Sequence, residues 1–367
     1  MISEKNKTVI IFSHALKDYD FGRLHPFRGD RFTAFLKLYQ EVLGNNGHFV
    51  LVKNEDLASD EELGLWHIQD YIRAMKAASA GMAIPGIKAF ISDDNLNPYT
   101  GRLPQGIERA ARAAVKNSLI AVDRVQQGHN ERAVSIGGGL HHALPDYGEG
   151  FCIYNDVVIA IKHALKSYEL KRILVLDTDA HAGNGTSAAF YADPRVLFID
   201  WHQAGIYPNS GSIDEIGTKA GEGFTINFPL PAGTSDAAYA FLFDQVVFPL
   251  AREYRPQMII RYGGSDPYYE DELTGLGLTL EGFEMIGSRV RQLSIELGLK
   301  RSVDFICSGY HLESLPKAWL SLITGLTGLK TIFHDPTSST KMQHTKHAED
   351  IADKIKQRLR PYWKCLK

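Results

Sequence analysis

Three polar side chains that could bind a metal ion follow one apolar run of the 367-residue sequence. After residues 173–176 the chain reads Asp-Thr-Asp-Ala-His, which spaces Asp177, Asp179 and His181 two residues apart. If the backbone stays extended, the three side chains point to one side. Because buried polar groups without partners are costly, and because carboxylate and imidazole together suit zinc or iron(II), the spacing predicts a metal site. A salt-bridged strand end with a satisfied histidine is the alternative.

A second apolar run, residues 258–260, also ends in polar residues. It continues as Arg-Tyr-Gly-Gly-Ser-Asp-Pro, in which the glycines allow a sharp turn before Asp266. We expect Asp266 to join Asp179 and His181 as a third ligand. Three protein ligands that leave a position for water are typical of a catalytic metal. The alternative for Asp266 is an Asx-turn before the proline.

Two further motifs offer proton transfer and oxyanion binding. His141 and His142 follow a run of three glycines, and histidine has the ordinary pKa nearest to working pH. They could be ligands, acid–base groups or exposed loop residues. Tyr310 follows the apolar run 303–306 and could donate a hydrogen bond to a developing oxyanion. A half-buried tyrosine with a solvated hydroxyl is the alternative.

The elements that position these residues alternate between short apolar runs and longer helical patterns. Continuously apolar runs predict parallel strands covered on both faces, so the chain is expected to have an α/β fold with a mostly parallel sheet between helices. The expected strands are residues 9–12, 173–176, 196–199, 258–260 and 303–306, and the expected helices are residues 107–127, 155–166, 237–254, 280–297 and 347–359. Glycine-rich and polar residues predict long loops at residues 92–106, 137–150, 203–223 and 263–277. Ligands bind at the carboxyl ends of parallel strands, so loops that follow strands are the candidates for a binding site. No linker divides the sequence, which favours a single domain over residues 1–367.

Composition excludes several classes of protein. Hydrophobic residues make up 44% and charged residues 23%, as in ordinary globular proteins. The 40 basic and 43 acidic residues give no basic face for nucleic acid. Three scattered cysteines are too few for a disulfide framework or a cysteine zinc site. With no apolar run long enough for a signal peptide or a membrane span, we expect a cytoplasmic protein that does not bind membranes.

In their order along the chain, these motifs resemble those of the histone deacetylase family, in the wider sense that includes bacterial acetoin-utilisation proteins and acetylpolyamine amidohydrolases. The resemblance extends from about residue 18 to residue 319. It rests on the segments 19–31, 139–156, 177–186, 264–279 and 309–310.

The resemblance implies a single-domain arginase–deacetylase-type fold with active-site loops at the strand carboxyl ends. It also implies a metal-dependent deacylase. Zinc, with iron(II) as the alternative, would be held by Asp179, His181 and Asp266, and a structural potassium ion would lie nearby with a contribution from Asp200. The implied substrate is acetylated lysine or a small acetylated amine such as a polyamine; the resemblance leaves the oligomeric state open. Of the implied catalytic residues, His142 would be the general base, with His141 beside it. Asp177 would orient His141, Asn184 would lie behind His142, and Tyr310 would donate to the carbonyl oxygen. The implied substrate contacts are Arg31, Asp94, Gly150 and Phe151.

The sequence also departs from the family pattern. Ala182 and Asn184 stand where relatives often have histidine and aspartate, and the segment Ile-Asp-Trp-His-Gln at residues 199–203 stands where many have a serine. The glycine run before the tyrosine is reduced to Ser308-Gly309. Two alternatives stay open: a binuclear manganese ureohydrolase, which shares the Asp-Ala-His-Ala motif but needs a second late aspartate pair, and a non-hydrolytic module that binds acylated amines.

Overall fold

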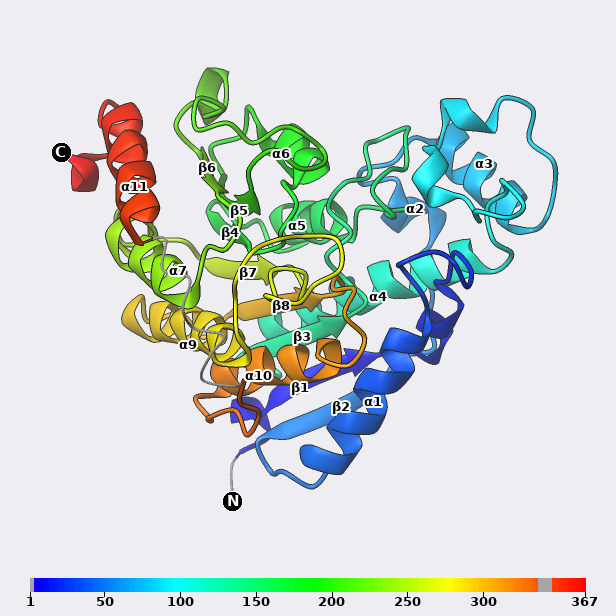
Figure 1. Ribbon diagram of the computed structural model, residues 1–367, viewed down its shortest axis with the longest axis horizontal. Helices are drawn as coiled ribbons and strands as arrows, with labels where there is room; N and C mark the ends of the chain where they lie inside the picture. The colour runs from blue at the N-terminus through cyan, green and yellow to red at the C-terminus, as the bar shows by residue number, and fades with distance from the viewer. Residues whose placement is uncertain (1–2, 336–344) are drawn as a thin grey trace. The chain divides into compact units, whose positions relative to one another are not determined.

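The computed structural model describes residues 3–335 and 345–367 (Figure 1). The chain divides into two compact units, one of Met1–Glu169 with Phe305–Cys307 and one of Leu170–Asp304 with Ser308–Lys367. Eight strands form one sheet in the order β2-β1-β3-β8-β7-β4-β5-β6. The expected α/β class with a parallel sheet is confirmed.

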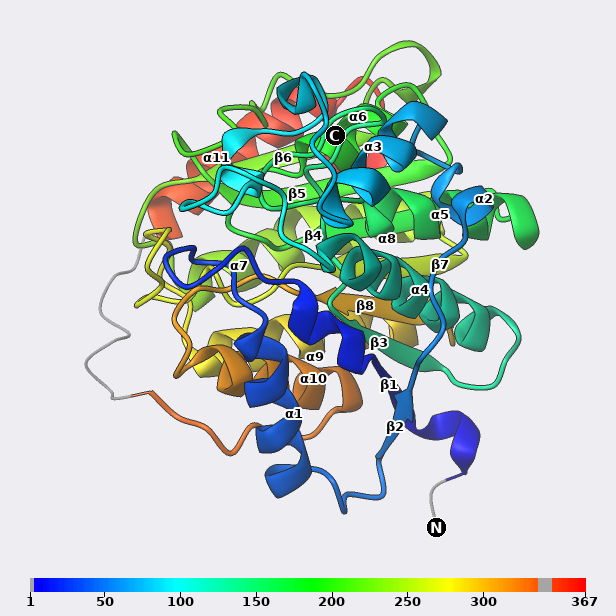
Figure 2. The same cartoon turned by 90° about the vertical axis from the view of Figure 1, so that its right-hand side faces the viewer.

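The first unit is built on three parallel strands. β1 (Thr8–Phe12) pairs with β2 (Phe49–Lys53) and with β3 (Arg132–Ile136). Helix α4 (Ile107–Gln126) packs on β1 and β3 and lies beside α5 (Asp156–Ser167) (Figure 2). Its four alanines between positions 110 and 114 are fully buried, and alanine combines high helix propensity with close packing. The other helices are α1 (Asp30–Val42), α2 (Asp60–Leu63) and α3 (Gln69–Ser79), with short 3₁₀ turns η1 (Glu4–Asn6), η2 (His14–Asp18), η3 (Ile87–Ala89) and η4 (Asp93–Asn95).

The second unit centres on β4 (Ile173–Asp177), which pairs in parallel with β5 (Val196–Gln203) and β7 (Met258–Tyr262). β5 also pairs with β6 (Thr225–Leu230). Every residue of β4 and β7 is buried, as expected of central strands. α9 (Leu280–Glu296) lies beside α10 (Leu315–Thr327), and α11 (Thr345–Leu359) packs against α7 (Asp236–Leu242) (Figure 1). The other elements of this unit are α6 (Asn184–Phe190), η5 (Lys219–Gly221), η6 (Phe243–Val247), α8 (Phe248–Tyr254) and η8 (Lys364–Leu366). The boundary between the units falls within β8 (Ser302–Ile306).

Two local expectations are corrected. The helix expected over residues 237–254 is α7 and α8 joined by the π-helical turn η6. Pro249 has no backbone N–H to continue the α-helical bonds at that point, which favours the wider turn. The backbone expected to stay extended from Asp177 to His181 leaves the strand at Asp177.

Candidate active site

The loop after β4 carries two potential metal ligands. Its backbone is held by the acidic side chains themselves: Asp177 Oδ1 accepts from the N–H of Asp179, and Asp179 Oδ1 accepts from the N–H of His181, each at 3.0 Å. These bonds turn the chain, yet the side chains of Asp179 and His181 still converge. Both backbone bonds bring hydrogen-bond donors to carboxylates that are almost fully buried.

The loop after β7 brings Asp266 to the same place. Gly263 makes this approach possible: it has a φ of +122°, and a Cβ there would lie 2.6 Å from the backbone nitrogen of Asp179. Only glycine fits so close an approach in that conformation. Asp266 is fully buried, and its carboxylate contacts His181 and Ser308. An Asx-turn alone would not account for the burial of this carboxylate or for its contacts with His181 and Ser308.

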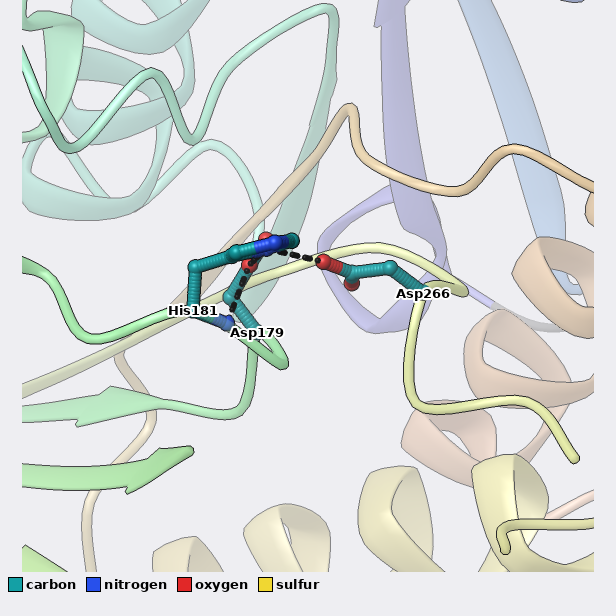
Figure 3. A group of neighbouring side chains, drawn as sticks. All are labelled: Asp179, His181 and Asp266. Atoms are coloured by element: carbon teal, nitrogen blue, oxygen red, sulfur yellow. Dashed lines mark hydrogen bonds and ion pairs between the residues drawn. The ribbon is translucent and has the colours of Figure 1, made fainter. Parts of the chain in front are cut away.

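Asp179, His181 and Asp266 form a compact donor set (Figure 3). One oxygen or nitrogen of each lies within 4.8 Å of the others. His181 Nδ1 lies 3.2 Å from Asp179 Oδ1 and 3.0 Å from Asp266 Oδ2. Within residues 3–335 and 345–367, this is the one such group of histidine, cysteine or acidic side chains.

The electrostatics of this donor set call for a cation. Burial, reinforced by the Asp179 carboxylate, raises the pKa of Asp266. Burial lowers the pKa of His181, but its hydrogen bonds and charge interactions with the two aspartates outweigh burial and raise it. Two buried carboxylates therefore compete for one imidazolium proton. A divalent cation would satisfy both carboxylates and the imidazole nitrogen, so the donor set fits a metal ion.

Tyr310 lies on the loop that follows β8. Its side chain is buried, and its backbone N–H donates to Asp271 Oδ2 at 2.7 Å. Burial raises the pKa of Asp271 to about 6. Ser308, two residues earlier, donates to Asp266 Oδ1 at 2.7 Å. This connection between the tyrosine loop and a candidate ligand was not among the sequence predictions.

Asp177, Asn184 and Asp200 surround the base of the β4 loop. Asp177 is fully buried, and Asn184 is the first residue of α6. Asp200 Oδ2 accepts from the N–H of Gly183 at 2.8 Å, and its Oδ1 lies 2.9 Å from His202 Nδ1. Both oxygens of Asp200 are therefore engaged by protein groups.

In the first unit, His141 and His142 are buried rather than exposed. Their Nε2 atoms lie 3.0 Å apart. Gly150, with a φ of +56°, packs against His142, since a Cβ at that position would lie 2.3 Å from its Cδ2. The exposed-loop alternative for the histidine pair is wrong.

Two residues of the first unit that the sequence analysis left without a role hold the histidine loop. Asp156 accepts from the N–H groups of Gly139 and Leu140 and from the Ser118 hydroxyl. Asn155 Nδ2 donates to the carbonyls of His141 and Ala143. The Asn-Asp pair immediately before an apolar helical run was the signal, because Asn155 caps α5.

The predicted substrate residues also lie in the first unit. Asp94 Oδ2 accepts from the N–H of Gly150 at 3.1 Å. Phe151 has a positive φ of 65°, and its ring packs on His25 with centroids 4.6 Å apart. Arg31 is fully buried and donates to the carbonyls of Pro26, Arg28 and Cys307.

Comparisons with known proteins identify the family and support the fold. Residues 25–326 match the model of the histone deacetylase domain. The chain is 34% identical over 340 residues to the acetoin utilization protein AcuC of Staphylococcus aureus, covering 89% of this chain and 83% of that protein. It is 32% identical to histone deacetylase 10, chloroplastic, of Oryza sativa, covering 90% and 76%. The crystal structure of the HDA15 HD domain superposes with a TM-score of 0.84 at 23% identity over 98% of this chain and 97% of that one, which supports the fold.

The fold and these relatives define the class of protein, a histone deacetylase domain whose buried Asp-His-Asp donor set is a possible metal site. The chain belongs to the histone deacetylase family, and it is a deacetylase, an amidohydrolase acting on linear amides. The predicted arginase–deacetylase-type fold is confirmed. Neither the ureohydrolase nor the non-hydrolytic alternative is supported.

Among the described residues, none of the helices has the length and apolar character that a membrane crossing requires.

Proposed function

We propose that the chain is a zinc-dependent hydrolase that removes acetyl groups from an amine such as acetyl-lysine or an acetylated polyamine. The observation that carries the proposal is the convergence of Asp179, His181 and Asp266 in a buried group that needs a cation. Zinc suits this mixture of carboxylates and imidazole, and iron(II) is the alternative that the assay below distinguishes.

Asp179, His181 and Asp266 would hold the metal. When bound, it would supply Lewis-acid chemistry, polarising the acetyl carbonyl and making water more acidic. The donor oxygens are already held in place, because Asp179 Oδ1 is bonded to the loop backbone and Asp266 Oδ1 to Ser308. Little reorganisation of the protein is then needed for binding.

His142 is proposed to take a proton from the attacking water and to give it to the leaving amine as the amide C–N bond breaks and acetate forms. The 3.0 Å separation of the two Nε2 atoms supports a role in proton transfer, since such a contact holds one proton between two nitrogens. Following the family pattern, Asp177 would orient His141 and Asn184 would stand behind His142. A neutral Asn184 stabilises a charged His142 less than a carboxylate would.

Tyr310 is proposed to donate from its hydroxyl to the acetyl oxygen as negative charge develops there. Arg31, Asp94, Gly150 and Phe151 remain the proposed substrate contacts. The hydrogen bond between Asp94 and Gly150 places the two residues side by side, which supports the proposal that both contact the substrate. For Arg31, complete burial on three carbonyls supports a role in holding its loop as well.

Three further proposals complete the account. The chain acts as one catalytic domain, which is supported by a family match that spans both units.

A structural potassium ion would use mainly backbone oxygens, because the Asp200 carboxylate is already bonded to Gly183 and His202. The cytoplasm remains the predicted location.

The direct test is acetate release by protein stripped with a chelator and then reloaded with Zn(II) or Fe(II). Acetyl-lysine peptides, acetylputrescine, acetylspermidine and longer acyl-lysines form the substrate panel. We expect no release by the stripped protein and restored release after loading. Equal activity with and without metal would contradict the proposal, and the preferred substrate would identify the acyl amine.

A further inference from the structure

The neighbours of the Ser308 hydroxyl determine which hydrogen bond it accepts and which it donates. The N–H of Gly264 can only donate, and it lies 2.7 Å from Ser308 Oγ. Ser308 Oγ therefore accepts this bond and uses its own proton to donate to Asp266 Oδ1 at 2.7 Å. The result is a short chain of hydrogen bonds from the backbone of the β7 loop through Ser308 to a candidate metal ligand.

The backbone of Ser308 is tied to the same loop. Its carbonyl accepts from the N–H of Ser265 at 2.9 Å and from Trp319 Nε1 at 3.0 Å. A Cβ on Gly264 would lie 1.9 Å from the Ser308 carbonyl oxygen. The loops after β7 and β8 therefore approach each other too closely at this point for any residue larger than glycine. Ser308 cannot withdraw from Asp266 without breaking these contacts.

The two oxygens of Asp266 consequently have different partners. Oδ1 faces Ser308, whereas Oδ2 faces His181 Nδ1 at 3.0 Å. The terminal torsion of an aspartate is soft, so a carboxylate held at only one oxygen can rotate. Asp266 is fully buried, and removing the donor to Oδ1 leaves that oxygen without its Ser308 partner in the interior.

We propose that Ser308 is a positioning residue that orients the Asp266 carboxylate and so sets the affinity of the site for its metal. The inference rests on the proposed function, because it takes Asp266 as a ligand. Ser308 stands where the sequence analysis found the family's glycine run shortened, and a glycine there has no hydroxyl to offer.

The test compares Ser308→Ala and Ser308→Gly with Ser265→Ala. Ser265 is a matched control: it is buried beside Asp266, and its hydroxyl has no hydrogen-bond partner among the described residues. Zn(II) dissociation constants are measured by competition with a chromophoric chelator, and the visible absorption of the Co(II)-loaded protein reports ligand geometry. Melting of the metal-free proteins checks folding, and Ser308→Gly carries the test if Ser308→Ala does not fold.

We expect both Ser308 variants to bind Zn(II) about tenfold or more weakly, the usual loss when a partner of a metal ligand is removed. Their Co(II) spectra should change, while Ser265→Ala stays within about twofold of the unmodified chain. Affinities of Ser308→Ala or Ser308→Gly within twofold of Ser265→Ala, with an unchanged spectrum, would overturn the inference alone. Failure of the unmodified chain itself to bind Zn(II) would instead overturn the proposed function.

Discussion

Buried charge dominates the energetics of Asp179, His181 and Asp266. Each of the two carboxylates lies near the same imidazole nitrogen, at 3.2 Å and 3.0 Å, and both are almost inaccessible to solvent. One proton cannot neutralise both carboxylates. A bound cation would relieve this unfavourable arrangement, and perturbed pKa values of this kind are typical of functional sites.

Replacing Tyr310 by phenylalanine tests the proposed oxyanion donor. The ring keeps its packing and the backbone N–H keeps its bond to Asp271, so only the hydroxyl is lost. We expect kcat to fall about a hundredfold, the scale for removing one such donor. Metal content should be unchanged. A decrease of less than about threefold would mean that the hydroxyl does not face the carbonyl.

His67 predicts a specific dependence of stability on pH. Its Nε2 accepts from the N–H of Asn155 at 3.0 Å, and burial lowers its pKa to about 3. The unfolded chain, with a histidine pKa of about 6.5, takes up a proton below that pH while the folded chain does not. The folded state therefore loses stability as pH falls from about 6.5 toward 3.

The variant His67→Gln removes this titration but can still accept from Asn155. Between pH 7 and pH 5 we expect the unfolding free energy of the unmodified chain to fall by about 2 kcal/mol more than that of the variant. Urea unfolding at both pH values measures the difference. Parallel pH profiles for the two proteins would mean that the pKa of His67 is the same in the folded and unfolded chains, which would contradict this prediction.

At the scale of elements, a buried ion pair links β7 to β8 within the second unit. Arg261 Nε donates to Asp304 Oδ2 at 2.9 Å, and Arg261 Nη1 donates to the carbonyl of Gly263 at 2.8 Å. Another bond from Nη1 reaches Thr178 Oγ1 in the β4 loop. Arg261 is fully buried, so this side chain fixes the strand ends from which Asp179 and Asp266 emerge.

Asp304→Ala leaves the Arg261 guanidinium buried without its carboxylate. We expect the unfolding free energy to fall by about 3–5 kcal/mol, the usual cost of an uncompensated buried charge. The double variant Arg261→Met with Asp304→Leu should be closer to the unmodified chain. Equal urea midpoints for Asp304→Ala and the unmodified chain would contradict a stabilising role for the pair.

The strands that the sequence predicted are those buried along almost their whole length. All five expected strands are present, because central parallel strands are apolar throughout. The strands that were missed have other patterns: β2 is mostly half-buried, and β6 contains Pro229 at the edge of the sheet. β3 carries polar Arg132 and Ser135 among its five residues, so it is not an uninterrupted apolar run. Apolar periodicity alone cannot identify such strands.

For the whole molecule, the sequence indicated which candidate ligands would converge better than it indicated the residues that hold them. Asp179, His181 and Asp266 follow apolar strands, and strand ends meet at one edge of a sheet. The contributions of Ser308 and Asp156 depend on which backbone N–H groups face them. Those directions arise from loop geometry, which leaves no periodic trace in the sequence.

If Asp179, His181 and Asp266 together bind one metal ion, the variant Asp266→Asn should lose it. The substitution preserves shape but removes a negative ligand. After loading with Zn(II) and exhaustive dialysis, we predict one ion per chain for the unmodified protein and a small fraction of that for the variant. Equal metal content in both proteins, or none in the unmodified protein, would contradict the account.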